Sequence, residues 1–200
     1  YVNAYHTNTV RKKQADISGE KYSEIDAYFD MVNQVELGGA LEQMYEEEAE
    51  LVGREEELYT LTILMNRKKT RSALLLGEAG TGKTALAEEW YRREISNQRN
   101  LYMYSLNIGT LGGGNSGGRD EQSLMISRLE NMMPKLQQFE RFIRIAQEDS
   151  NVKNKAEVVL FIDEVHKVVS SFGVGSKVGG DALKRSLGRG TIRVIAATTR

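Results

Sequence analysis

The 200-residue chain contains no cysteine and only two histidines, His6 and His166. The lack of cysteine excludes disulfide bonds, cysteine-ligated metals and a thiol nucleophile. Two histidines are also too few for a metal site built from several imidazoles. Because a chain without thiols fits a reducing compartment, we expect a cytoplasmic protein.

Long apolar runs and an excess of either charge are missing as well. No stretch approaches the roughly 20 apolar residues of a membrane span. The first residues also lack the basic and apolar segments of a signal peptide. The 27 basic and 28 acidic residues give a formal net charge of −1. We therefore expect neither a membrane nor a nucleic-acid partner. The chain does not begin with Met, which is consistent with a piece of a longer protein.

Residues 1–50 are expected to form an N-terminal arm and a helical linker. Residues 1–20 are polar and lack a pattern, which is typical of a mobile arm. A helix is predicted by apolar residues at helical spacing, which are Ile25, Tyr28, Phe29, Val32 and Val35. Gly38 and Gly39 should end it, and a second helix is predicted from Leu41 to about Ala49. Such helices either pack on the main domain or link it to a neighbour.

Residues 51–200 alternate between helical segments and short apolar runs. The predicted helices are 55–65, 84–95, 121–147 and 181–187, and the predicted buried strands are 73–76, 101–106, 158–162 and 192–197. This alternation predicts an α/β fold with a parallel sheet between two helical layers. The sole proline, Pro134, should kink or split its helix. Six glycines between Gly109 and Gly118 predict a flexible loop.

A phosphate-binding loop follows the first predicted strand. The pattern G-x-x-x-x-G-K-[ST] is matched at every required position by Gly77, Glu78, Ala79, Gly80, Thr81, Gly82, Lys83 and Thr84. Glycines let the backbone amides approach phosphate oxygens at the start of a helix. Lys83 is then expected to contact the β- and γ-phosphates, and the Thr84 hydroxyl to bind Mg²⁺. An ordinary glycine-rich turn is the alternative, but the position between strand and helix favours the phosphate site.

Two adjacent acids follow the third predicted strand. Because ligands bind at the carboxyl ends of parallel strands, Asp163 and Glu164 should emerge beside the phosphates. We expect Asp163 to hold Mg²⁺ through a water molecule, and Glu164 to orient and deprotonate the attacking water. His166 is either a structural histidine or a reporter of the nucleotide state. Thr198 and Thr199, after the last strand, either serve the γ-phosphate and water or cap a following helix.

These residues together resemble the first ATPase domain of the Clp-type AAA+ unfoldases. Besides the phosphate loop, the matching segments are Leu51–Glu57, Phe161–His166, Leu183–Gly190 and Ala196–Thr199. The resemblance implies an AAA+ version of the P-loop NTPase fold, with ATP and Mg²⁺ as cofactors. It implies that Val52 and Gly53 line the adenine pocket. It also makes Thr199 the sensor-1 residue, with Thr198 as second choice.

The resemblance further implies hexameric rings that thread protein substrates, with adaptors as partners. Two features depart from it. The segment that corresponds to the first pore loop, 112–120, has no aromatic residue. The fifth strand, the arginine finger and the helical lid of the family would lie beyond Arg200. One alternative is therefore an AAA+ switch or scaffold without threading activity. A second alternative is a DNA-acting AAA+ ATPase, which the basic cluster Arg67–Arg71 supports. Such a cluster is also typical of a solvated helix end.

Overall fold

The computed structural model describes residues 19–44, 51–68, 71–111, 119–148, 152–170, 177–188 and 192–199. Five strands in this part of the chain form one sheet: β1 (Leu41–Gln43), β2 (Ser72–Leu76), β3 (Leu101–Leu106), β4 (Glu157–Ile162) and β5 (Arg193–Thr198). Their order is β1-β3-β4-β5-β2. β2, β3, β4 and β5 are parallel, and β1 pairs with β3 in the antiparallel direction. The predicted parallel sheet is confirmed.

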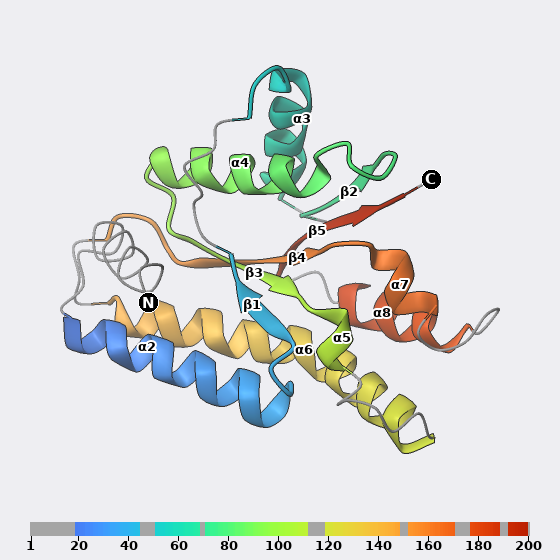
Figure 1. Ribbon diagram of the computed structural model, residues 1–200. Helices are drawn as coiled ribbons and strands as arrows, with labels where there is room; N and C mark the ends of the chain where they lie inside the picture. The colour runs from blue at the N-terminus through green and yellow to red at the C-terminus, as the bar shows by residue number, and fades with distance from the viewer. Residues whose placement is uncertain are drawn as a thin grey trace.

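Helices cover both faces of this sheet (Figure 1). The described helices are α2 (Gly19–Met31), the π-helical turn η1 (Val32–Glu36), α3 (Glu55–Met65), α4 (Lys83–Ser96), α5 (Ile108–Leu111), α6 (Arg119–Ala146), α7 (Val165–Ser170) and α8 (Val178–Gly188). α3 and α4 cover one face, while α2 and α6 lie on the other with α7 and α8. The result is the three-layer arrangement that the sequence predicts.

β4 shows why the predicted strands are continuous apolar runs. Its residues Val158, Leu160 and Ile162 are buried toward α2 and α6. The alternate residues Val159 and Phe161 are buried toward α3 and α4. A central strand of a parallel sheet has no face toward water, so all its positions after Glu157 are apolar.

The segment around Leu41 differs from its prediction. Instead of a helix from Leu41 to about Ala49, residues Leu41–Gln43 form β1 at the edge of the sheet. Gly38 and Gly39, with φ of +65° and +72°, turn the chain after η1 and bring it alongside β3. The short apolar pattern suited either structure, and pairing with β3 decides for the strand. Residues 45–50 lie outside the described part.

Other predicted boundaries agree with the structure to within a few residues. The helix predicted from Ile25 runs through α2 and η1 and ends before Gly38. Pro134 does not split α6, which continues on both sides of it. The predicted glycine loop begins as the short helix α5, and residues 112–118 lie outside the described part.

Residues 19–44 pack against the main domain. Tyr28 of α2 stacks on Phe142 of α6 with ring centroids 4.4 Å apart, and Phe29 stacks on Tyr104 of β3 at 4.3 Å. Ile25, also of α2, is fully buried in the same core. The interpretation of 1–50 as a separate linker segment stays a prediction, but its described part shares the core of the sheet.

Asn33 closes the outer edge of β1. Its amide donates to the carbonyl oxygen of Leu41 at 2.7 Å, and its side-chain oxygen accepts from the Leu41 amide at 2.9 Å. The backbone groups of Leu41 point away from β3, because Ala40 and Met44, on the alternate positions, bond toward β3 at Asn107 and Met103. An edge strand normally exposes such groups for pairing with another chain. The buried side chain of Asn33 replaces that neighbour.

An ion-pair cluster fixes α4 against α3. Arg93 of α4 donates to both carboxylate oxygens of Glu55, at 2.6 and 2.7 Å, and to the buried Glu89 at 2.7 Å. Arg92 adds two further bonds to Glu89 at 2.7 Å. Hydrogen bonds from Arg92 and Arg93 lower the pKa of Glu89 to about 2, although burial opposes this. The cluster therefore holds the start of α3 beside α4.

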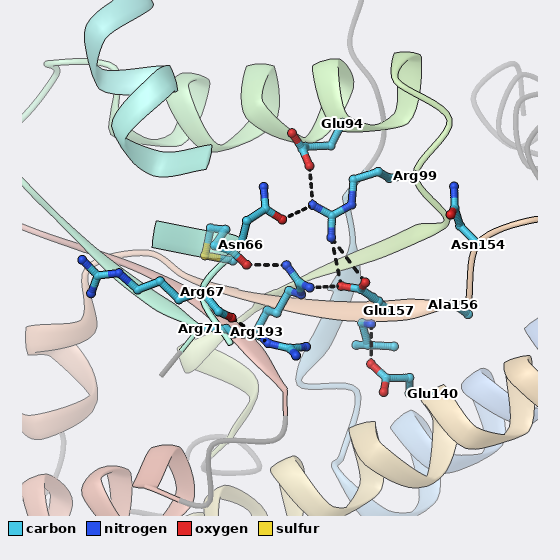
Figure 2. A network of polar contacts seen from close by, with 12 residues as sticks. Asn66, Arg67, Arg71, Glu94, Arg99, Glu140, Asn154, Ala156, Glu157 and Arg193 are labelled. Carbon is cyan, nitrogen blue, oxygen red and sulfur yellow. Dashed lines mark hydrogen bonds and ion pairs between the residues drawn. The ribbon is translucent and has the colours of Figure 1, made fainter. Parts of the chain in front are cut away.

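A second polar network closes the amino-terminal edge of the sheet (Figure 2). Buried Arg193, at the start of β5, pairs with Glu157 of β4 and donates to the carbonyl oxygen of Met65. Arg99 bridges Glu157 and Glu94, at 3.1 and 2.6 Å. A buried guanidinium without partners is costly, so breaking these contacts is unfavourable. The contacts thereby hold the end of α3 against β4 and β5.

α6 joins the same edge through two further contacts. Glu140 accepts the Val158 amide at 2.8 Å, and Arg144 donates to the Ala156 carbonyl at 2.8 Å. Burial raises the pKa of Glu140 above its ordinary value, and the bond from Val158 opposes that shift. The long helix is thereby held at the amino-terminal end of β4.

We predict that Asn33→Ala lowers the free energy of unfolding by about 1–3 kcal/mol, because both backbone groups of Leu41 lose their partners. Asn33→Asp should be no better, since a carboxylate cannot donate to the Leu41 carbonyl. Urea unfolding measures both. The control is Asn131→Ala, an exposed site on α6, with an expected change within about 0.5 kcal/mol. Equal effects at the two positions would contradict the edge-closing role.

We also predict that Glu157→Gln costs about 3 kcal/mol of unfolding free energy, because it leaves the buried Arg193 charge without its carboxylate. The matched control breaks an exposed pair: Glu130→Gln removes the partner of Arg185. Its expected cost is at most about 1 kcal/mol. Thermal or urea unfolding compares them, and a similar loss in both variants would refute the importance of burial.

Candidate nucleotide-binding site

The predicted phosphate loop connects the end of β2 to the start of α4. Gly80 and Gly82 both have φ of +76°, a region that side chains disfavour. A Cβ on Gly77 would lie 2.8 Å from the Thr81 hydroxyl oxygen. The loop backbone therefore depends on glycine at three motif positions. The first amides of α4 have no partners within the helix and form an electropositive end.

Lys83, the first residue of α4, folds back over this loop. Its ammonium donates to the carbonyl oxygens of Gly77 and Glu78, at 3.2 and 2.8 Å. The Thr81 hydroxyl also donates to the Glu78 carbonyl at 2.9 Å. The predicted loop residues Glu78, Ala79, Gly80 and Thr81 are exposed. The loop thus holds one fixed positive charge beside a row of accessible backbone atoms.

Asp163 meets the loop helix from the end of β4. Its carboxylate accepts the Thr84 hydroxyl at 3.0 Å, across 79 residues of sequence. The meeting follows from strand register, because Leu76 pairs with Thr198 and Ile162 pairs with Ala196 along the intervening β5. The carboxyl ends of β2, β4 and β5 therefore lie at one edge of the sheet. The structure brings these two predicted Mg²⁺ ligands together.

The oxygen atoms of Thr84 and Asp163 suit Mg²⁺. Mg²⁺ takes oxygen ligands at about 2.1 Å in octahedral geometry, which places neighbouring ligands about 3 Å apart. Among the described residues, no group of three or more His, Cys, Asp or Glu could hold a metal alone. A hydroxyl and one carboxylate are a donor set that Mg²⁺ uses when phosphates supply other ligands.

Glu164 lies beside Asp163 in a strained turn. Its φ is +47°, and its amide donates to Asp163 Oδ1 at 2.8 Å. Its carboxylate forms an ion pair with Lys167 in the first turn of α7. A hydrogen bond from Lys167 lowers the pKa of Glu164, and the charges of Lys167, His166 and Lys83 act in the same direction. The lowered pKa favours the ionised carboxylate that a proton acceptor requires, but it also makes this carboxylate a weaker base while it is paired with Lys167.

Thr198, at the end of β5, connects the phosphate loop to α7. Its carbonyl oxygen accepts the Gly77 amide at 3.4 Å, at the first residue of the phosphate loop. Its hydroxyl lies 2.9 Å from Nδ1 of His166. Thr199 follows the strand and is half-buried. Of the two threonines proposed for the γ-phosphate and water, the second choice is the one engaged with α7.

The expected adenine segment lies next to the loop. Val52 is 85% exposed, and Gly53 has φ of +84°. Arg54, which sequence reasoning missed, donates to the Thr81 carbonyl at 3.2 Å and pairs with Glu57 at 3.1 Å. A cation directly before a predicted helix and two residues after Val52 was the available signal. The assignment of Val52 and Gly53 to adenine stays a prediction.

Comparisons with known proteins show the family of this domain. The family model of the AAA ATPase domain matches residues 50–109. The chaperone protein ClpB of Bacteroides thetaiotaomicron is 28% identical over 96% of the chain. The chloroplastic chaperone protein ClpD1 of Oryza sativa is 33% identical over 74%. The chain carries an AAA ATPase domain related to the Clp-type AAA+ ATPases. It covers 20% of the length of that ClpB and 15% of ClpD1.

Solved structures of related ATPases have the fold of this AAA domain. Hsp104 of Saccharomyces cerevisiae, in its complex with casein, matches with a TM-score of 0.57 and 28% identity. That match covers 82% of this chain and 26% of Hsp104. Trip13 assembled with HORMA and CdnC from E. coli matches with a TM-score of 0.58 over 80% of this chain and 62% of the other. Its 19% identity supports the fold alone. The predicted P-loop NTPase topology is confirmed.

The helices described in the AAA domain include none with the length and apolar character of a membrane span.

We predict that Lys167→Met raises the pKa of Glu164 toward its ordinary value, because the largest lowering influence is removed. A pH titration of the Glu164 carboxyl carbon by NMR measures the shift. Lys153→Met, at an exposed lysine in the loop before β4, should leave that titration unchanged. An unchanged Glu164 titration in Lys167→Met would show that the ion pair has no influence in solution.

Proposed function

We propose that this domain binds ATP with Mg²⁺ and hydrolyses it to ADP and phosphate. The observation that carries the proposal is the contact between Thr84 and Asp163 at the mouth of a glycine-dependent loop. A separate carboxylate, Glu164, stands next to that contact, and its amide donates to Asp163 Oδ1. Binding alone requires only the loop, whereas the two adjacent acids supply both a metal ligand and a base. Their joint presence favours hydrolysis over a domain that only binds nucleotide.

The residues divide the reaction among them. Backbone amides of the loop and α4 bind the phosphates, and Lys83 exchanges its carbonyl partners for phosphate oxygens. Thr84 and Asp163 would hold Mg²⁺, which neutralises phosphate charge. Glu164 accepts a proton from the water whose oxygen attacks the γ-phosphorus. The bond between the γ-phosphorus and the bridging oxygen breaks, and ADP leaves with that electron pair.

For the whole protein, we infer an ATP-driven hexameric ring that remodels protein substrates, with adaptors as further partners. Support comes from the ClpB and ClpD1 chaperones and from the Hsp104 complex with casein. An AAA+ switch or scaffold would share the site described here but lack unfolding activity. The segment 112–118, which lacks an aromatic residue, lies outside the described part of the chain.

We predict that Lys83→Ala abolishes ATP binding at concentrations that saturate the unmodified protein, because it removes the ammonium that lies over the carbonyl oxygens of Gly77 and Glu78. Glu164→Gln should retain binding and lose about 100-fold or more in hydrolysis rate, since the amide cannot accept the proton. Binding is followed by calorimetry and hydrolysis by phosphate release.

The controls are Lys153→Ala and Glu148→Gln, which change the same residue types at exposed positions far along the chain. Both should bind and hydrolyse ATP at unmodified rates. Unchanged affinity in Lys83→Ala would overturn the phosphate site, and unmodified turnover in Glu164→Gln would overturn the base.

The remodelling function is tested on the full-length protein. It should assemble as a hexamer with ATP and unfold a tagged substrate, while the Glu164→Gln protein should assemble without unfolding. Assembly and hydrolysis without unfolding would instead support the switch.

A further inference from the structure

We propose that His166 is a positioning residue that acts through Thr198 to hold the end of β5 against the hydrolytic turn. The inference rests on the proposed ATP hydrolysis and adds to it a residue that neither binds nucleotide nor accepts the proton. The contact that carries it joins two elements: His166 lies in the first turn of α7, directly after the acid pair, and Thr198 ends β5.

The turn from Asp163 to Lys167 makes contacts in three directions. Asp163 bonds to Thr84 of α4, Glu164 pairs with Lys167 inside the turn, and His166 bonds to Thr198. Thr198 in turn accepts the Gly77 amide through its carbonyl. The His166–Thr198 contact therefore closes a ring of bonds that runs from the phosphate loop through α4, the acid pair and β5 back to the loop.

The hydrogen-bond roles inside this contact follow from the count of protons. The Thr198 hydroxyl has one proton. It can donate this proton to the Thr199 carbonyl oxygen, which lies 3.3 Å away. Both contacts of this hydroxyl are hydrogen bonds at the same time only if Nδ1–H of the imidazole donates across the 2.9 Å contact to His166. The structure thus assigns the Nδ1–H form to His166, with Nε2 left toward the exposed side of the ring.

The strand alternation explains what this contact positions. Val194 and Ala196 of β5 belong to the core shared with α6 and α7, while Ile195 and Ala197 belong to the core shared with α4. Thr198 continues the first series and meets His166 on α7. Thr199, by the same alternation, is next on the side of the phosphate-loop helix. Fixing Thr198 therefore fixes the direction of Thr199, the residue expected to serve the γ-phosphate and water.

The test uses ATP hydrolysis by the full-length protein in five variants. His166→Ala and Thr198→Val each remove one partner and should lower kcat about 3- to 10-fold, with KM changed less than about twofold. The double variant should be no slower than the slower single variant, because both remove the same bond. His166→Asn places an amide nitrogen where Nδ1 stands and should restore kcat to within about twofold. Ser170→Ala, at an exposed site on α7, is the control and should match the unmodified rate.

A second measurement does not depend on activity. Nitrogen NMR of the imidazole, assigned by its loss in His166→Asn, should show the Nδ1–H form, and Thr198→Val should abolish that preference. If the unmodified protein hydrolyses no ATP, the proposed function fails while this measurement still judges the contact. If hydrolysis is normal but the two single losses multiply in the double variant, or Asn fails to rescue, the positioning role is overturned. If the unmodified protein does not show the Nδ1–H form, the positioning role is also overturned.

Discussion

The hydrogen bond between Thr84 and Asp163 is the constraint on which the site depends. It joins the first turn of α4 to the end of β4, two positions that share no local sequence. The bond exists because β5 lies between β2 and β4, and parallel pairing on both sides brings their carboxyl ends level. A shift of one residue in either register would turn the strand's buried side chains to the opposite face. Burial of both faces of β4 therefore protects the site geometry as well as the core.

The amino-terminal and carboxyl-terminal ends of the parallel strands are built differently. At the amino-terminal edge, Arg193 and Glu157 are paired with little access to water, and α3 and α6 are tied to the same strands. At the carboxyl edge, Lys83, Glu164 and Lys167 are partly exposed and hold partners that other groups could replace. Buried charge pairs are hard to break, whereas exposed ones cost little to exchange. The buried ion pairs at the amino-terminal ends keep the strands in place while the exposed pairs at the carboxyl-terminal ends exchange partners.

Sequence reasoning predicted the parts of the fold with strong local signals. Helix Glu55–Met65 has apolar residues on one face and acids in its first turn, and its bounds were predicted as observed. The glycine loop and the acid pair were found because their chemistry restricts residue type. β1 was missed because three residues, Leu41–Gln43, hold too little pattern to distinguish a strand from a helix. Its formation depends on β3 and on Asn33, which lie elsewhere in the chain.

The contacts of the site that escaped prediction are of the same non-local kind. Arg54, just before α3, meets Thr81 in the loop after β2, and His166 of α7 meets Thr198 at the end of β5. From sequence, Thr198 and Thr199 were adjacent hydroxyls of equal chemistry at the end of a strand. Alternation along β5 separates them, because neighbouring side chains of a strand face opposite layers. Thr198 belongs to the layer of α7, where it contacts His166, and by alternation the next position belongs to the layer of α4 and its phosphate loop. The proposed division of roles between Thr198 and Thr199 thus follows from the layered sheet and needs no difference between the two residues.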